Sequence, residues 1–140
     1  MANQALDRII NFFPEVRRAQ LLMDLSLNLK ALVSQRLIPK QDGKGRVAAV
    51  EIMLNSPLIS DLIFKGDVTE IKEIMKKSRN LGMQTFDQAL FDAYESNLIT
   101  YEDALRNADS LNDLRLQIKL NSQRGRAQDL GAGTENFAIV

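Results

Sequence analysis

The sequence predicts a mostly α-helical protein that contains one β-hairpin. Three observations support this fold class. Apolar residues recur at helical spacing through most of the first 120 residues. The spacing changes between residues 36 and 54, where two apolar runs flank a turn that contains Asp42, Gly43 and Gly45. Residues 121–140 have no periodic pattern and are expected to form a flexible tail.

Two helices are expected before the hairpin. Residues 2–13 carry apolar side chains at helical spacing, and Pro14 ends this helix while suiting the first turn of the next. The second helix is expected to span residues 15–36. Leu25, Leu27 and Leu29 alternate, so a strand is an alternative there, but the length and the scarcity of β-branched residues favour a helix.

The hairpin is expected to pair residues 36–40 with residues 46–54. The second strand is almost continuously apolar, which is typical of a strand covered on both faces. Such a strand needs more sheet than one hairpin provides. Glu51 interrupts the apolar run, and a buried carboxylate requires a partner or a function. We expect an ion pair with Arg36 or Arg46 rather than catalysis.

The remainder up to residue 120 is expected to be helical. Helices are predicted over residues 57–65, 67–79 and 84–96, then from residue 100 and over residues 110–120. Asp67, Thr85 and Thr100 precede three of these helices and are predicted to cap them.

The composition restricts the chemistry that the chain can perform. It has no cysteine, which removes disulfides and thiolate nucleophiles, and no histidine, the most common general base. The 18 basic residues balance the 18 acidic ones, so we expect no nucleic-acid binding. No signal peptide or membrane-spanning run is evident, and the chain is predicted to be cytoplasmic.

No residue is predicted to be catalytic, to bind a cofactor or to bind a metal. Gly43-Lys44-Gly45 is interpreted as a hairpin turn, because the phosphate-loop pattern G-x-x-x-x-G-K-[S/T] is absent from the sequence. The other side chains considered are interpreted as surface or helix-flank charges: Asp24, Asp61 and Asp87, and the basic pairs Arg17-Arg18 and Lys76-Lys77.

An ordered series of segments resembles a known family. The segments are ALDRIINFFP, LLMDLSLNLKALVSQRLIPK, GKGRVAAVEIMLNSPLISDLIFKGD and GMQTFDQAL. Together they resemble the C-terminal part of type IV pilus retraction ATPases, the PilT/PilU group of the secretion ATPase superfamily. The resemblance covers residues 2–120, and the order and spacing of the segments make it specific.

Within this group the chain looks more like the PilU type than the PilT type. PilT-like proteins carry the pattern Ala-Ile-Arg-Asn-Leu-Ile-Arg-Glu after the second strand. The aligned segment here is PLISDLIF, in which Asp61 aligns with the asparagine, and Ser60 and Phe64 replace the two arginines. The apolar frame is kept and the basic residues are lost.

The resemblance implies a domain arrangement. Residues 1–54 would form the C-terminal end of a RecA-like α/β ATPase core, residues 55–120 a helical C-terminal subdomain and residues 121–140 the tail. The segment expected to couple this subdomain to neighbouring subunits or partners consists of Pro57, Leu58, Ile59, Ser60, Asp61, Leu62 and Ile63.

The resemblance also implies a function. Intact family members hydrolyse ATP with Mg²⁺ in a cytoplasmic hexameric ring at the inner-membrane base of the pilus, and so power pilus disassembly and twitching motility. The phosphate loop and acidic boxes of the family have no counterpart here, so the chain is predicted to be a fragment that is inactive alone. Expected partners are other ring subunits, in a homo- or hetero-oligomer, and the pilus base machinery, through which it would be peripheral to the membrane. The alternative is a non-enzymatic helical module that binds these partners.

Overall fold

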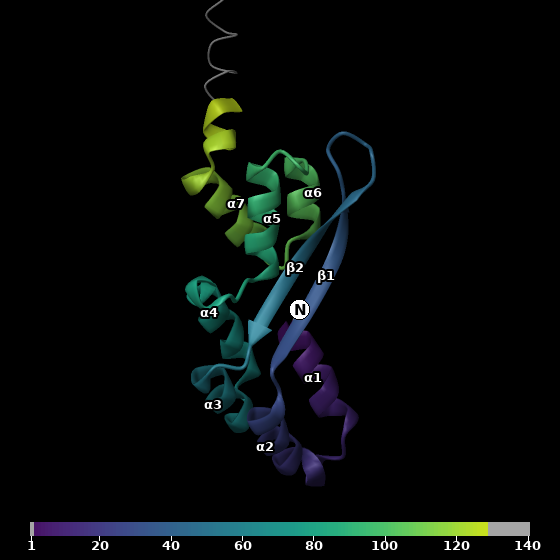
Figure 1. Ribbon diagram of the computed structural model, residues 1–140, viewed down its shortest axis with the longest axis vertical. Helices are drawn as coiled ribbons and strands as arrows, with labels where there is room; N and C mark the ends of the chain where they lie inside the picture. The colour runs from purple at the N-terminus through teal and green to yellow at the C-terminus, as the bar shows by residue number, and fades with distance from the viewer. Residues whose placement is uncertain (1, 129–140) are drawn as a thin grey trace, which may run out of the picture.

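The computed structural model describes residues 2–128, and its architecture confirms the predicted fold class: mostly helical with one antiparallel hairpin (Figure 1). The helices and strands are α1 (Ala2–Phe12), α2 (Arg18–Asn28), β1 (Ala31–Pro39), β2 (Arg46–Leu54), α3 (Pro57–Lys65), α4 (Ile71–Lys76), α5 (Phe86–Glu95), α6 (Tyr101–Asn107) and α7 (Leu111–Asn121). Short 3₁₀ turns at residues 15–17, 68–70 and 79–81 connect some of them.

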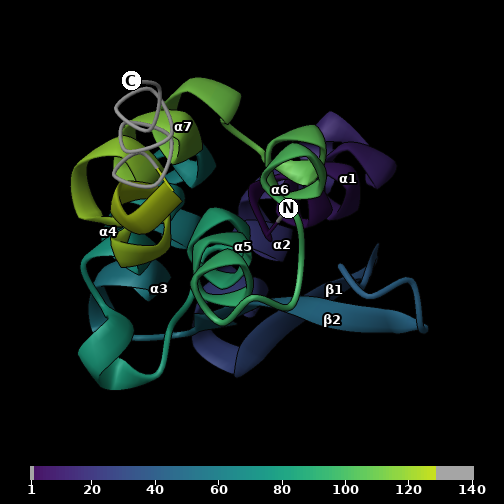
Figure 2. The same cartoon turned by 90° about the horizontal axis from the view of Figure 1, so that it is seen from above.

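The hairpin forms the spine of the molecule. β1 and β2 pair antiparallel from Ala31 with Leu54 to Pro39 with Arg46. Gly43 and Gly45 have φ angles of 75° and 89°, a conformation that side chains disfavour, so the predicted glycine turn is confirmed. Viewed from above, α1, α5 and α6 lie on one side of the hairpin (Figure 2). Helices therefore cover one face of the sheet.

β1 begins earlier than the sequence predicts. The helix expected over residues 15–36 ends at Asn28, and residues 31–36 are a strand. The prediction was wrong because cross-strand pairing overrides local propensity: Leu32 and Val33 lie opposite Met53 and Ile52 on β2. Leu25, Leu27 and Leu29, whose alternation suggested a strand as the alternative, lie just before β1 begins at Ala31.

The helices after the hairpin are defined by local capping. The Thr85 hydroxyl accepts a hydrogen bond from the Gln88 amide, and the Gln88 side chain accepts one from the Thr85 amide, which completes a capping box. The Thr100 hydroxyl accepts from the Asp103 amide in the same way. Asp67 differs from the prediction, because its side chain makes no capping hydrogen bond and a 3₁₀ turn precedes α4.

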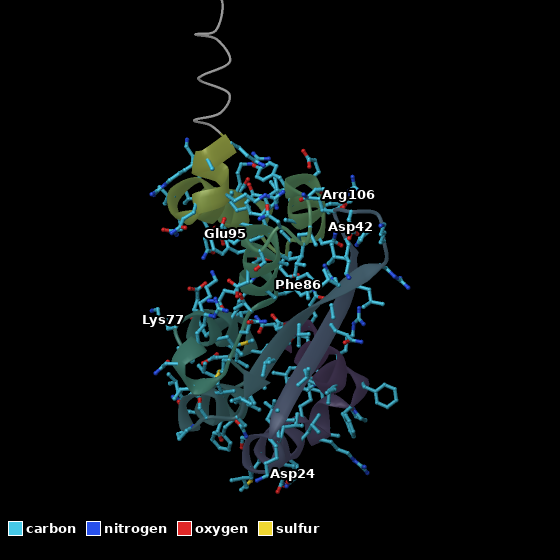
Figure 3. The ribbon with its side chains drawn as sticks, turned by 45° about the horizontal axis from the view of Figure 1, so that its top comes forward. Asp24, Asp42, Lys77, Phe86, Glu95 and Arg106 are labelled. Carbon is cyan, nitrogen blue, oxygen red and sulfur yellow. The ribbon has the colours of Figure 1, made fainter. Side chains whose placement is uncertain are left out.

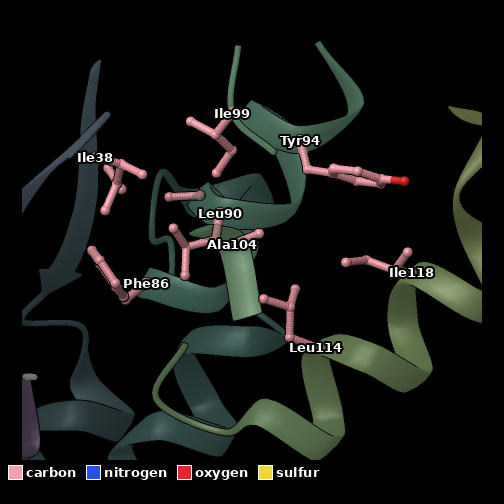
Figure 4. Packing of buried hydrophobic residues seen from close by; sticks show 10 residues of the cluster. Ile38, Phe86, Leu90, Tyr94, Ile99, Ala104, Leu114 and Ile118 are labelled. Carbon is pink, nitrogen blue, oxygen red and sulfur yellow. The ribbon is translucent and has the colours of Figure 1, made fainter. Parts of the chain in front are cut away.

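Two hydrophobic clusters lie along the covered face of the hairpin. The α1 cluster consists of Ala2, Leu6, Met53, Ile59, Ile63, Val68, Ile71, Met75 and Met83. The α5 cluster, shown in Figure 4, consists of Ile38, Ala49, Phe86, Ala89, Leu90, Tyr94, Ile99, Ala104, Leu114 and Ile118. Both clusters take residues from the hairpin, so neither forms without it.

Glu51 lies between these two clusters. Side chains of a strand alternate between faces, so Glu51 shares the covered face of β2 with Ala49 of the α5 cluster and Met53 of the α1 cluster. It is 2% exposed. One carboxylate oxygen accepts from the Ala2 amide at 2.6 Å and the other from the Phe86 amide at 3.3 Å. These amides begin α1 and α5, where the helix dipole favours a negative charge. One carboxylate therefore holds two helices.

The expectation of an arginine partner for Glu51 is wrong for Arg46. Arg46 is five residues away on the same strand and therefore on the opposite face. Arg36 lies on the covered face, where its guanidinium stacks over the Phe86 ring at 4.7 Å. It also donates to the Asn107 carbonyl at 2.9 Å and lies 3.8 Å from the Asp109 carboxylate. Arg36 thus joins β1 to the loop between α6 and α7.

The other face of the hairpin is apolar and partly open. The register places Val33, Leu37, Val50 and Ile52 on this face. Val33 is 66% exposed and Leu37 49% exposed, whereas Val50 and Ile52 are partly buried. At the edge of β2, Ile52 and Gln84 exchange two backbone hydrogen bonds in an isolated antiparallel bridge. The sequence predicts that β2 is covered on both faces; among the described residues helices cover one face, and Val50 and Ile52 on the other face are only partly buried.

The predicted tail begins in ordered structure. Residues 123–128 are helical, and the Ser122 side chain, which is fully buried, donates to the Glu95 carboxylate. The prediction placed the boundary too early because residues 121–128 lack an apolar stripe and are held by polar contacts instead. The rest of the predicted tail, residues 129–140, lies outside the described residues. No helix within residues 2–128 combines the length and apolar character needed to cross a membrane.

We predict that Glu51→Gln lowers the free energy of unfolding by about 1–3 kcal/mol, because one of the two helix N-termini loses a charged acceptor in a buried place. Urea denaturation followed by circular dichroism measures this. The control is Glu73→Gln, which removes an exposed pair with Lys76 and should change stability by less than about 1 kcal/mol. Equal effects of the two substitutions would contradict the role assigned to Glu51.

Candidate functional site

The candidate coupling segment, residues 57–63, forms most of α3, which spans the residues that the sequence predicts. The Ser56 hydroxyl accepts from the Ile59 amide and caps the helix, and Pro57 occupies its first turn, where no amide donor is needed. Gly66 ends the helix with a φ angle of 77°. Local sequence therefore fixes both ends of α3 and the direction in which each of its side chains points.

The inner face of α3 has a structural role. Ile59 and Ile63 are fully buried in the α1 cluster, and Leu62 is partly buried against it. The Ser60 hydroxyl donates to the Ser26 carbonyl at 2.6 Å. Ser60, which replaces an arginine of the PilT-like pattern, thus binds the last turn of α2 and is not available to a partner.

Asn55, just before α3, completes this contact. Its side-chain amide donates to the carbonyls of Ser26 at 3.0 Å and Leu29 at 2.7 Å. The last carbonyls of a helix lack partners within the helix, so these hydrogen bonds stabilise the end of α2. Asn55 and Ser60 together fix α2 against α3. Sequence reasoning missed this role, since nothing local connects residue 55 with residue 26.

The outer face of α3 consists of Leu58, Asp61, Phe64 and Lys65. Leu58 is 51% exposed and Phe64 56% exposed, and these two large apolar side chains lie on either side of Asp61 on the outer face. Asp61 and Lys65 form an exposed ion pair at 2.8 Å. The hydrogen bond that the Lys65 ammonium donates to the Asp61 carboxylate, together with the negative charge of that carboxylate, raises the pKa of Lys65. The outer face is therefore apolar with one neutralised charge pair, and it suits contact with another protein surface.

The acidic residues considered in the sequence do not form one site. Asp24 lies at one end of the molecule, far from Asp42 at the hairpin turn (Figure 3). Asp24 is exposed and accepts from the Gln20 side chain. Asp87 was expected at the surface but is buried, because its carboxylate accepts from the Asp109 and Ser110 amides at the start of α7. Asp87 is thus a second helix-binding carboxylate.

The glycines and lysines that could suggest a phosphate loop have other contacts in the described part of the chain. Residues 2–128 contain no group of three acidic side chains placed to hold a metal ion. Gly43 and Gly45 form the hairpin turn, and the Lys44 amide donates to the Asp42 carboxylate instead of facing a phosphate site. Lys76 pairs with Glu73 on the surface. No step of ATP hydrolysis is therefore assigned to these side chains.

Comparison with known proteins connects this chain to pilus motors. It is 63% identical over 138 residues to the type IV pilus ATPase PilU of Pseudomonas aeruginosa, which is 99% of this chain and 36% of PilU. It is 37% identical over 107 residues to the retraction ATPase PilT of the same organism, 76% of this chain and 31% of PilT. A twitching motility protein of Neisseria gonorrhoeae is 36% identical over 78% of this chain and 29% of that protein. The chain spans about a third of the length of these relatives. No family model matches it.

Solved structures agree with the sequence relatives. The crystal structure of the pilus retraction motor PilT with bound ADP superposes with a TM-score of 0.71 at 32% identity, over 81% of this chain and 31% of that one. The ATPase DotB of Legionella pneumophila gives a TM-score of 0.60 at 19% identity, over 74% of this chain and 28% of DotB, which shows a shared fold alone. These shares fit the predicted C-terminal part of a larger ATPase.

We predict that the two faces of α3 respond differently to truncation. Ile59→Ala should lower the free energy of unfolding by about 2–5 kcal/mol, because it leaves a cavity in the α1 cluster. Leu58→Ala should change it by less than about 0.5 kcal/mol, because the side chain is half in solvent. Urea unfolding of the two variants measures the difference. Comparable losses would mean that the outer face is packed and not free.

Proposed function

We propose that this chain, which belongs to the family of the type IV pilus ATPases PilU and PilT, is the C-terminal portion of a hexameric retraction ATPase of the PilU type. The whole protein would hydrolyse ATP with Mg²⁺ in a ring on the cytoplasmic side of the inner membrane, at the base of the pilus, and so power pilus disassembly and twitching. The observation that carries this proposal is the 63% identity to PilU over 99% of the chain.

The hairpin supports the assignment to one part of an ATPase. Its open face presents Val33 and Leu37 to solvent, while the opposite face is fully used by the two clusters. In the proposed whole protein, this face would meet further strands of a RecA-like core. Residues 1–54 would then belong to that core, and residues 55–120 would form the helical subdomain that follows it. The nucleotide site would be supplied by parts of the protein outside this chain.

The outer face of α3 is proposed as the surface that couples this subdomain to a neighbouring subunit or to the pilus machinery. PilT-like proteins place two arginines on this segment, and Ser60 and Phe64 stand in their places here. Ser60 is used internally by its hydrogen bond to Ser26, and Phe64 is exposed. We infer that this surface recognises its partner by apolar contact instead of by charge.

A second candidate function is a non-enzymatic module that binds ring subunits without turnover. The α1 and α5 clusters favour the binding module, because their buried apolar residues would stabilise the fold of residues 2–128 in the isolated chain. An immunoblot of source cells with an antibody against residues 57–120 separates the two candidates. A band far above 15.8 kDa supports the retraction ATPase. A band at 15.8 kDa alone would contradict it and leave the binding module.

We predict that Leu58→Asp combined with Phe64→Asp, placed in the longer protein, reduces the twitching zone on agar several-fold without lowering the amount of protein. Charge on both side chains would oppose an apolar contact. The matched control is Leu116→Asp with Leu120→Asp on α7, two leucines of similar exposure, which should leave twitching unchanged. Normal twitching of the α3 variant would reject the coupling surface and leave the family assignment intact.

A further inference from the structure

A pocket of about 430 Å³ opens between α5, α6, α7 and residues 123–128. Tyr94 and Tyr101 form one wall, and their rings make an edge-to-face contact with centroids 6.1 Å apart. Tyr94 and Ile118 are 1% and 5% exposed, so Tyr101 supplies most of the apolar surface of this wall. Figure 4 shows the Tyr94 ring extending from α5 on the side of the cluster where Ile118 lies. The volume is within the range of about 300–1,000 Å³ that is usual for small-molecule sites.

Residues 122–128 build the opposite wall, and Arg124 fixes them in place. Its guanidinium stacks on the Tyr94 ring at 4.3 Å and donates to the carbonyls of Tyr94 at 2.7 Å and Ile99 at 2.8 Å. It also donates to the Gln41 side chain in the hairpin turn. Arg124 therefore holds in place the segment that brings Arg126 to the pocket.

The charged residues that line this pocket are all positive. Arg115 and Lys119 come from successive turns of α7, and Arg126 comes from the segment that follows. Among residues 2–128, no carboxylate lines the pocket and none forms an ion pair with these three side chains. Arg126 also donates to the Leu120 carbonyl at 2.7 Å. In a chain whose net charge is zero, three cations around one pocket that lack a carboxylate partner among residues 2–128 are a local excess that attracts an anion.

We propose that this pocket binds a small phosphate ester, with the phosphate at Arg115, Lys119 and Arg126 and the organic part against the partly exposed Tyr101 ring. Guanidinium groups bind phosphate oxygens with paired hydrogen bonds, and a phosphate monoester carries a charge of about −1.5 to −2 at neutral pH. The pocket is larger than an inorganic anion needs, and the partly exposed Tyr101 ring suits a flat organic group. This inference does not depend on the proposed function.

The test is a titration of the ¹⁵N-labelled full chain with adenosine 5′-monophosphate, followed by amide chemical shifts. We expect saturable shifts at Gly125 and around Tyr101, absent with adenosine, which lacks the phosphate. Arg115→Gln combined with Lys119→Gln should weaken binding about tenfold or more, since each removes a charged hydrogen-bond donor. The matched control, Lys72→Gln in α4 with Lys77→Gln directly after it, removes the same charge away from the residues that line the pocket and should bind as the unmodified chain does.

Three outcomes would overturn the proposal. The first is no saturable binding of adenosine 5′-monophosphate. The second is equal binding of adenosine, which would show that the cations are not used. The third is equal weakening in both double variants, which would show non-specific attraction to net charge. The spectra themselves report whether each variant is folded, so a loss of binding can be separated from a loss of structure.

Discussion

The carboxylate of Glu51 is the interaction on which the rest of the structure depends. It occupies the position on β2 where the α1 cluster ends and the α5 cluster begins, and it binds the first amides of α1 and α5. A buried charge is costly unless its lone pairs are satisfied, and helix N-termini satisfy them with aligned donors. One side chain thereby fixes the relative positions of two helices that are more than 70 residues apart in the chain. Asp87 repeats the device at the start of α7.

The hairpin gives these helices a common base. Ile38 and Ala49 contribute to the α5 cluster and Met53 to the α1 cluster, so both clusters share one face of a single two-stranded sheet within the described residues. The proposed domain boundary lies between residues 54 and 55. The two hydrophobic clusters do not follow this boundary, because each combines residues of the hairpin with residues of later helices. Movement of α3 relative to α5 would therefore have to bend or slide along β2. This connection is what a subdomain needs if it is to transmit the state of an ATPase core to an outer surface such as that of α3.

Local features of the structure could be predicted from the sequence, and contacts between distant residues could not. Ser56-Pro57 and Gly66 fix α3, and Thr85 with Gln88 fixes α5, because each signal lies within a few residues of what it determines. The start of β1 depends on residues 52–54 across the sheet, and no local pattern at residue 31 reveals it. The role of Arg124 depends in the same way on Tyr94, Ile99 and Gln41. Of the candidate site, the exposed and buried sides of α3 follow from helical period, but the use of Ser60 against α2 does not.

The open face of the hairpin also affects the tendency of this chain to self-associate in solution. A two-stranded sheet with Val33 and Leu37 on its surface offers apolar side chains next to backbone groups that can pair with another strand. Two copies could pack these faces together without any change in fold, so the isolated chain should self-associate more as its concentration rises. Covering this face, by further strands of a larger protein, would remove that tendency and add buried apolar area at the same time. Self-association of the isolated chain therefore depends on whether further strands cover this face of the sheet.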